Sequence, residues 1–250
     1  MGNITVANIN FSALSKSLNT DELSMLPSTV ALFMKLNSID ALCTTGISDE
    51  LIEKIATKEY LLGYSNAVNG KKQSKLLRGI YAPNSIVLRS VMLKEANQYR
   101  LAGYTDVIRS VVEKEQTPTS TVSTLYTPTL AEFLLINANI PKNSSNSINE
   151  YAVSLLADVI KEKKIPTLLL GTFELDDVDR LYFQERLELL GISKISKEES
   201  PFQVFASEGL EADSHSVKYL NIGQSTTEVG LTKLKLRWLT NNHSNAIINT

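Results

Sequence analysis

Apolar side chains in the first part of the chain recur every three or four residues, as they do on one face of a helix. Two segments show this spacing, the first with Pro27 placed near its start and the second after residues 48–50: Leu23, Leu26, Val30, Phe33 and Met34, then Leu51, Ile52, Ile55 and Leu62. Each stripe covers one side of its helix, so each helix must dock on another surface. The first 70 residues are therefore predicted to form a helical module.

A polar stretch, residues 66–75, follows these helices and contains the turn dipeptide Asn69-Gly70. Turn dipeptides between periodic segments mark connections. We place a boundary near residue 72 and predict two domains, residues 1–72 and residues 73–250.

Beyond this boundary, short apolar runs alternate with helical patterns. Strands are predicted at 76–81, 133–136 and 166–170, helices at 85–98, from 147 onward and at 175–190, and loops at 117–128 and 141–146; residues 105–115 fit either a strand or a helix. Ser147 and Glu150 have capping-box spacing, and Gly191 ends a helix. Strands joined by such long connections pair in parallel. The predicted fold class is α/β, with a mostly parallel sheet flanked by helices.

The carboxy-terminal segments have a different pattern, in which apolar and polar residues alternate with period two. Half-exposed strands show this alternation. The pattern covers residues 202–205, 217–222 and 234–238, and predicts strands that extend the sheet or form an edge hairpin.

Composition sets outer limits on function. The 250 residues are 43% hydrophobic with a formal net charge of -2, which gives no general attraction to nucleic acid. A single cysteine, Cys43, excludes an intramolecular disulfide. The first residues lack the pattern of a signal peptide, and no apolar run approaches the roughly 18 residues of a membrane span. We expect a cytoplasmic protein without membrane contact.

Residues 76–93 have the layout of a phosphate-binding loop: an apolar strand, a turn and a helix. Such a loop needs glycines, because its backbone curls closely around the anion, and a Lys followed by Ser or Thr. Here Pro83 and Leu88 stand in place of the glycines and Arg89 in place of the lysine, so that only Ser90 fits the pattern.

Over residues 76–192, the order of elements resembles the P-loop core, AAA+ or RecA-like, of phage and bacterial helicase loaders. The resemblance implies a second strand ending in two acids, where this chain has Asn137 and Ala138, and a third strand ending in a polar sensor, here Thr172. It implies an arginine that reaches a neighbouring subunit, here Arg180 or Arg186. It also implies that the amino-terminal helices grip a partner protein.

Two parts needed for phosphoryl transfer are missing together, because Asn137 lacks the charge of the Mg²⁺-holding acid and Ala138 lacks the activating base. Hydrolysis is therefore not expected, and no cofactor is predicted. Nucleotide binding through Arg89 stays open, although Pro83 and Leu88 hinder the backbone from curling around a phosphate.

Other groups with chemical potential have structural explanations. The acids Glu174, Asp176, Asp177 and Asp179 at a helix start are read as surface acids favoured by the helix dipole. His215, His243 and Cys43 belong to no recognisable nucleophile or metal motif, so we assign them structural roles.

Basic residues gather before the first predicted strand of the second domain and along the last predicted strand. They form either a solvated face or a contact for a nucleic-acid backbone: Lys71, Lys72, Lys75 and Arg78, then Lys233, Lys235 and Arg237.

These observations favour a non-catalytic, ATPase-like assembly or loading factor in nucleic-acid metabolism, with a protein partner held by the amino-terminal helices. Nucleic-acid contact and oligomerisation are left open. The alternative is a viral or phage structural protein of the nucleocapsid type that self-assembles or coats nucleic acid. A third reading is an enzyme with an unrecognised site.

Overall fold

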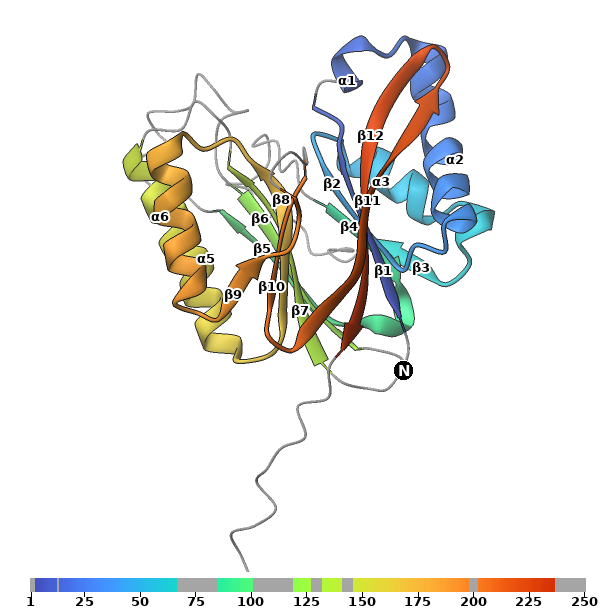
Figure 1. The fold of residues 1–250 in the computed structure, drawn as a ribbon. Helices are drawn as coiled ribbons and strands as arrows, with labels where there is room; N and C mark the ends of the chain where they lie inside the picture. The colour runs from blue at the N-terminus through green and yellow to red at the C-terminus, as the bar shows by residue number, and fades with distance from the viewer. Residues whose placement is uncertain are drawn as a thin grey trace, which may run out of the picture.

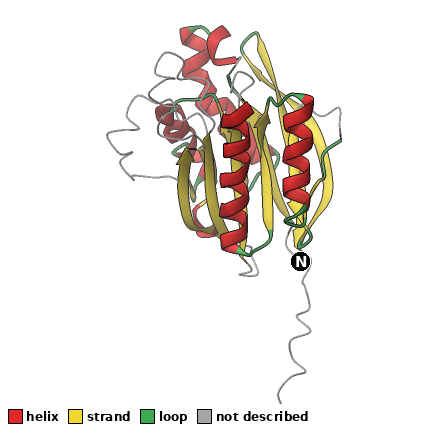
Figure 2. Cartoon of the chain, turned by 90° about the vertical axis from the view of Figure 1, so that its left-hand side faces the viewer, coloured by secondary structure: helices red, strands yellow, loops and turns green. Residues whose placement is uncertain are grey.

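In a computed structural model of the chain, two six-stranded sheets face each other and helices cover the outer side of each (Figures 1 and 2). The described residues are 3–12, 14–66, 85–100, 119–126, 132–140, 146–197 and 202–236. The chain is therefore a four-layer α/β sandwich.

The first sheet has the order β11-β12-β1-β2-β4-β3, and only β1 and β2 run parallel. α2 and α3 pack on its outer face (Figure 1). Its strands are β1 (Ile4–Asn10), β2 (Ala41–Thr45), β3 (Tyr64–Asn66), β4 (Ser85–Arg89), β11 (Leu210–Ile222) and β12 (Ser225–Leu236), and its helices are α1 (Leu14–Ser17), α2 (Thr20–Leu36), α3 (Asp49–Ala56) and the 3₁₀ turn η1 (Glu59–Leu61).

The second sheet has the order β5-β6-β7-β8-β10-β9, with β7 and β8 as its parallel pair. α5 joins β7 to β8, α6 follows β8, and both cover the outer face of the sheet (Figure 2). The strands are β5 (Leu93–Arg100), β6 (Thr119–Tyr126), β7 (Glu132–Ile140), β8 (Thr167–Phe173), β9 (Ile192–Lys194) and β10 (Gln203–Ser207), with η2 (Ser90–Met92), α5 (Asn146–Lys163) and α6 (Asp177–Glu188).

Apolar side chains from both sheets fill the space between them. The first sheet contributes inner residues such as Ile4, Val6 and Cys43, and the second contributes Phe133 and Leu170. All five are almost completely buried. Burial of this layer favours folding by about 25 cal/mol for each Å² of apolar surface removed from water, so this layer holds the two sheets together.

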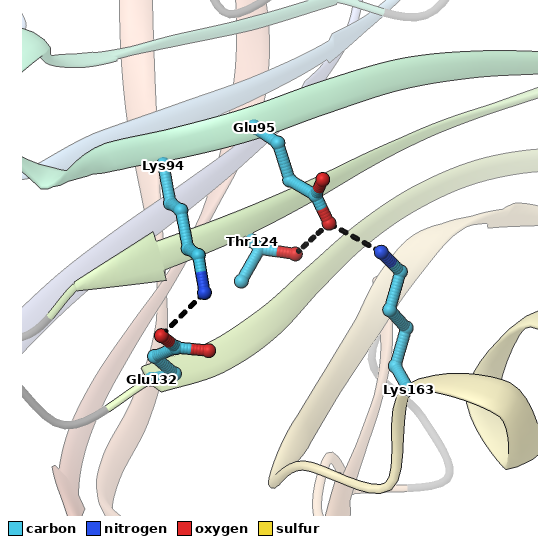
Figure 3. A network of polar contacts seen from close by, with 5 residues as sticks. All are labelled: Lys94, Glu95, Thr124, Glu132 and Lys163. Carbon is cyan, nitrogen blue, oxygen red and sulfur yellow. Dashed lines mark hydrogen bonds and ion pairs between the residues drawn. The ribbon is translucent and has the colours of Figure 1, made fainter.

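The edge strand β5 is fastened to its own sheet by charged side chains (Figure 3). Lys94 Nζ lies 2.5 Å from a carboxylate oxygen of Glu132 on β7. On the next residue, the Glu95 carboxylate pairs with Lys163 at the end of α5 and accepts a hydrogen bond of 3.0 Å from Thr124 on β6. The ammonium of Lys163 lowers the pKa of Glu95. Two consecutive residues of β5 thus contact three different elements, β7, α5 and β6.

The predicted mostly parallel sheet is wrong, since each sheet contains one parallel pair and is otherwise antiparallel. Residues 85–98, predicted as a helix, form β4, η2 and most of β5. Ile86, Val87 and Leu88 are buried on both faces of β4, and a short apolar run of that kind does not distinguish a strand from a buried helix. The predicted loop at 117–128 contains β6, a strand rich in Thr and Ser.

The two amino-terminal helices are confirmed as α2 and α3, but Pro27 lies well inside α2, which begins at Thr20 after the capping residue Asn19. The same region also supplies β1, which pairs between β12 and β2. It is therefore not a purely helical module. The proposed boundary near residue 72 falls outside the described residues, and strands from both sides of it share the first sheet.

Several other predictions are confirmed. The apolar run at 133–136 lies within β7, the run at 166–170 belongs to β8 from Thr167 onward, and the predicted helices there are α5 and α6. Gly191 follows α6 with a φ of 70°, as a helix-ending glycine does. The alternating carboxy-terminal segments form β10, β11 and β12, and β11 and β12 make a hairpin at the edge of the first sheet.

Gly171 on β8 is paired with Ala138 on β7, and the Ala138 backbone occupies the space that a side chain at Gly171 would need. Its φ is +147°, and a Cβ placed there would lie 1.8 Å from the Ala138 carbonyl oxygen. We expect Gly171→Ala to lower the free energy of unfolding by more than about 3 kcal/mol, since only backbone movement relieves this overlap. Urea unfolding at neutral pH measures the loss.

Gly63→Ala is the matched control. Gly63 also has a positive φ, +84°, but no atom lies within 4 Å of its added Cβ. The expected cost is about 1 kcal/mol from the left-handed backbone alone. Equal losses in the two variants would contradict the close approach of β7 and β8.

Candidate functional site at the strand ends

The inner face of the sandwich changes from apolar to polar along the strands. On β1, Ile4 and Val6 are followed on the same face by Asn8 and Asn10, because alternate residues of a strand share a face. On β7, Phe133 and Leu135 are likewise followed by Asn137 and Asn139. In both sheets the polar residues lie toward the carboxyl end of the strand.

These ends meet at one edge of the sandwich. β1 and β2 are parallel, β7 and β8 are parallel, and the two pairs pack against each other across the inner layer, with their carboxyl ends uppermost in Figure 1. We name the polar inner residues at these ends the strand-end site: Asn8, Asn10, Thr45, Asn137, Asn139 and Thr172. All six side chains are uncharged.

Polar contacts at this site connect one sheet to the other. Asn137 Nδ2 donates a hydrogen bond of 2.9 Å to the Thr44 carbonyl oxygen. The hydroxyl oxygens of Thr45 and Thr172 lie 3.4 Å apart. Asn8, Asn137 and Thr45 are buried, while Asn10, Asn139 and Thr172 are half-buried. The site therefore has a buried floor and a rim that reaches solvent.

Asn8 stands out on this floor. Its side chain is 3% exposed, and its Nδ2 lies 3.5 Å from the Gly171 carbonyl oxygen, the outer limit for a hydrogen bond. Its Oδ1 is buried and has no hydrogen-bond partner among the described residues. An unsatisfied buried acceptor costs about 1–3 kcal/mol. A buried polar group in this condition calls for an explanation, and a role in binding or catalysis is one.

The donor set can be compared with the needs of a metal ion. Divalent cations such as Mg²⁺ and Ca²⁺ prefer carboxylate oxygens, and phosphoester hydrolysis often uses such an ion. The strand-end site supplies amide and hydroxyl groups instead, and the described part of the chain brings together no group of three His, Cys, Asp or Glu that could hold a metal. These residues do not fit a divalent cation.

Two of the residues singled out in the sequence, Asn137 and Thr172, come together here, whereas Ala138 faces the helix-covered side of its sheet. Asn137 and Ala138 lie near the end of β7, and Thr172 lies near the end of β8. Sequence reasoning missed Asn8, Asn10, Thr45 and Asn139. The signal was present, because polar side chains follow apolar positions of equal parity in each strand, but using it required knowing which strands face each other.

The two candidate arginines lie on α6 and are engaged locally. Arg180 lies 3.2 Å from Asp177 and donates to the Leu175 carbonyl oxygen at 3.1 Å. Arg186 donates to the Tyr182 hydroxyl at 3.0 Å. Both interactions hold the side chain to its own helix or to the residues just before it.

Most of the residues compared with a phosphate loop lie elsewhere. Leu88 is fully buried in β4, and Ser90 begins η2. Arg89 ends β4 and forms an ion pair of 2.8 Å with Asp40 at the opposite end of the first sheet from the strand-end site. It also donates to the Tyr64 hydroxyl. Pro83 lies outside the described residues.

The basic clusters are only partly described. Lys233 is exposed on β12, and Lys235 is two residues further along the same strand. The others, Lys71, Lys72, Lys75, Arg78 and Arg237, lie outside the described residues.

Among the remaining candidates, Asp179 differs from the prediction of a surface acid, since it is buried. Cys43 is fully buried, and burial raises the pKa of its thiol. His215 Nδ1 lies 3.1 Å from the Thr232 hydroxyl, and partial burial lowers the pKa of the imidazole. Asp176 caps α6, and Asp179 accepts a hydrogen bond of 2.7 Å from Asn149. His243 lies outside the described residues.

Comparisons with known proteins identify the fold to which this architecture belongs. Neither a protein-family model nor a curated protein sequence matches the chain. Solved structures match over nearly its full length. An endonuclease/exonuclease/phosphatase from Bacteroides vulgatus has a TM-score of 0.70 at 15% identity, covering 95% of this chain and 100% of that one. The chain has the endonuclease/exonuclease/phosphatase fold.

Two further structures with this fold are D. rerio TDP2 complexed with a single-strand DNA product and the human Nocturnin catalytic domain with bound sulfate. TDP2 has a TM-score of 0.67 at 8% identity, covering 94% of this chain and 100% of that one. Nocturnin has a TM-score of 0.65 at 13% identity, covering 94% of each chain. At such identities the likeness establishes the fold.

This fold overturns the P-loop resemblance. A P-loop core requires a strand leading through the phosphate loop into a helix, but Ser85–Arg89 is a strand, antiparallel to β2. The helicase-loader reading therefore loses its basis, and the match to structures of nucleases and phosphatases speaks against the nucleocapsid reading as well. The prediction that the protein is not an enzyme rested on the same resemblance, through the altered loop and through Asn137 and Ala138, and is corrected too, since matching structures are described as nucleases or phosphatases.

The cytoplasmic location and the protein partner stay predictions. Within the described ranges, no helix combines the length and the apolar character that crossing a membrane would require.

The Arg89–Asp40 ion pair generates a pH-dependent prediction. Burial raises the folded pKa of Asp40 above its usual 3.8, while the Thr5 amide and Arg89 oppose that rise. As the pH rises above 3.8, ionisation of Asp40 therefore lowers the free energy of unfolding. Removing Arg89 makes this loss larger. We expect Arg89→Met to lower the free energy of unfolding by about 1 kcal/mol at pH 7 and by less at pH 4.5. The value at pH 7 is discounted for solvent screening, because the guanidinium is half-exposed.

Urea unfolding at the two pH values measures the difference. Lys54→Met is the control, because it breaks an exposed pair with Glu50 and should change stability by less than about 0.5 kcal/mol. If Arg89→Met lowered the free energy of unfolding equally at both pH values, the contribution of Arg89 to stability would not come from its charge.

Proposed function

We propose that the protein is a phosphoesterase, of the nuclease or phosphatase class, that acts on its substrate at the strand-end site. One observation carries the proposal: the carboxyl ends of two facing parallel pairs place six polar side chains at one edge of this fold. Support also comes from solved structures of the same fold, whose names include a mannosyl-6-phosphatase and a 2′,3′-cyclic phosphatase.

The polar side chains of the strand-end site determine which interactions a phosphoester could make there. A phosphoester presents several oxygen acceptors, and the half-buried rim offers one hydroxyl and two amide donors: Thr172, Asn10 and Asn139. Donors held where negative charge develops stabilise a transition state. The buried floor keeps this rim in place through the Asn137–Thr44 hydrogen bond.

Hydrolysis of simple esters tests the proposal. The full chain is incubated with 4-nitrophenyl phosphate, a monoester, and with bis(4-nitrophenyl) phosphate, a diester, each with Mg²⁺ and with EDTA. We expect nitrophenol release above a matched blank from at least one ester. Thr172→Val removes one rim donor but keeps the side-chain shape, so kcat/KM should fall by about 10-fold or more.

Thr226→Val is the matched control, because Thr226 is exposed in the β11–β12 hairpin and bonds Asn221. It should leave turnover unchanged. Absence of release from both esters, or equal rates in the two valine variants, would rule out catalysis at the strand-end site. Unfolding of each variant is measured alongside, so that loss of fold is not mistaken for loss of chemistry.

A further inference from the structure

We propose that a groove on the outer face of the first sheet binds the phosphate group of a small phosphorylated ligand. This outer groove has a volume of about 390 Å³ and is lined chiefly by Thr5, Ser38, Ser214, Ser216, Lys218 and Lys233. That volume is within the range of small-molecule sites. The proposal does not depend on catalysis at the strand-end site.

The groove follows from strand geometry. Ser214, Ser216 and Lys218 alternate along β11, so their side chains share one face. Lys233 on β12 is paired with Ser214 in the register, and Leu231, which also lines the groove, belongs to the core beneath α2. The polar residues therefore stand on the helix-covered side of the sheet, beside the end of α2.

Charge identifies the ligand as an anion. Two ammonium groups line the groove, and no Asp or Glu is among its described lining residues. Asp40 accepts a hydrogen bond from the amide of Thr5, one of the lining residues, and is occupied by its ion pair with Arg89. Ammonium and hydroxyl groups together match the several acceptor oxygens of a phosphate.

The carboxyl end of α2 would by itself repel an anion, because helix carbonyls carry partial negative charge there. Its last carbonyls are already engaged. Phe33 O accepts from the Asn37 amide, Lys35 O accepts from the Ser38 amide at 3.2 Å, and Met34 O accepts from the Ile39 amide at 2.9 Å. The negative end of the helix is thus largely satisfied before a ligand arrives.

One lysine is held in position in advance. Lys218 Nζ donates to Asn37 Oδ1 at 2.5 Å, and Asn37 Nδ2 donates to the Phe33 carbonyl oxygen at 2.9 Å. An ammonium group has three donors, so this bond leaves others for a ligand. Fixing a flexible lysine beforehand reduces the ordering cost of binding.

The groove is separate from the strand-end site. Thr5 lies near the start of β1, whereas Asn10 ends that strand, and the two residues point to opposite faces of the sheet. Ligands of the two sites would not compete for the same side chains.

Titration with inorganic phosphate, followed by calorimetry at constant ionic strength, tests the proposal in the full chain. We expect saturable binding to the unaltered protein. Lys218→Met and Lys233→Met should each weaken it by about five-fold or more, because each removes a charge-assisted hydrogen bond. Lys197→Met is the control, since Lys197 is exposed and lies outside the groove, and it should not change the affinity.

Absence of saturable binding, or equal affinity in all three methionine variants, would overturn the proposal. If Thr172→Val abolished phosphate binding while the two groove variants retained it, the anion would belong to the strand-end site. Loss of phosphate binding in the two groove variants, with binding retained in Lys197→Met and Thr172→Val, would support the groove whether or not the protein hydrolyses esters.

Discussion

Contact between the inner faces of the two sheets is the constraint on which the structure depends. Each sheet has a helix-covered outer face, so the apolar inner residues can leave water only by meeting those of the other sheet. The same contact brings the carboxyl ends of β1 and β2 against those of β7 and β8. Without it, the polar residues of the strand-end site would belong to two separate surfaces.

At the polar end of the strands, hydrogen-bonding groups take part in the contact between the sheets, and this lowers stability. The Asn137–Thr44 hydrogen bond and the Thr45–Thr172 pair replace apolar packing there, and no residue in the described part of the chain satisfies Asn8 Oδ1. An apolar residue in place of Asn8 would avoid this cost, which is consistent with selection for something other than stability. The uncharged character of the site also separates it from phosphoester sites built on carboxylate-held cations.

The sequence predicted local structure better than the arrangement of its elements. Capping and periodicity located α2, α3, α5 and α6, because these signals lie within a few residues of each other. They could not show that β1 pairs with β12, more than 200 residues away in the chain. Ser85–Arg89 was mistaken because a strand buried on both faces shows no alternation. Thr172 and Asn137 were noticed as polar residues at strand ends, but their meeting depends on the packing of two sheets.

Cys43 has a practical value that follows from its position. Its thiol lies on the inner face of β2, within the layer that joins the sheets, and burial keeps it protonated. Thiol-modifying reagents attack the thiolate, so they should reach this sulfur only when the sandwich opens. The chain has no second cysteine. The rate of thiol modification would therefore measure how often the two sheets separate, with no engineered probe.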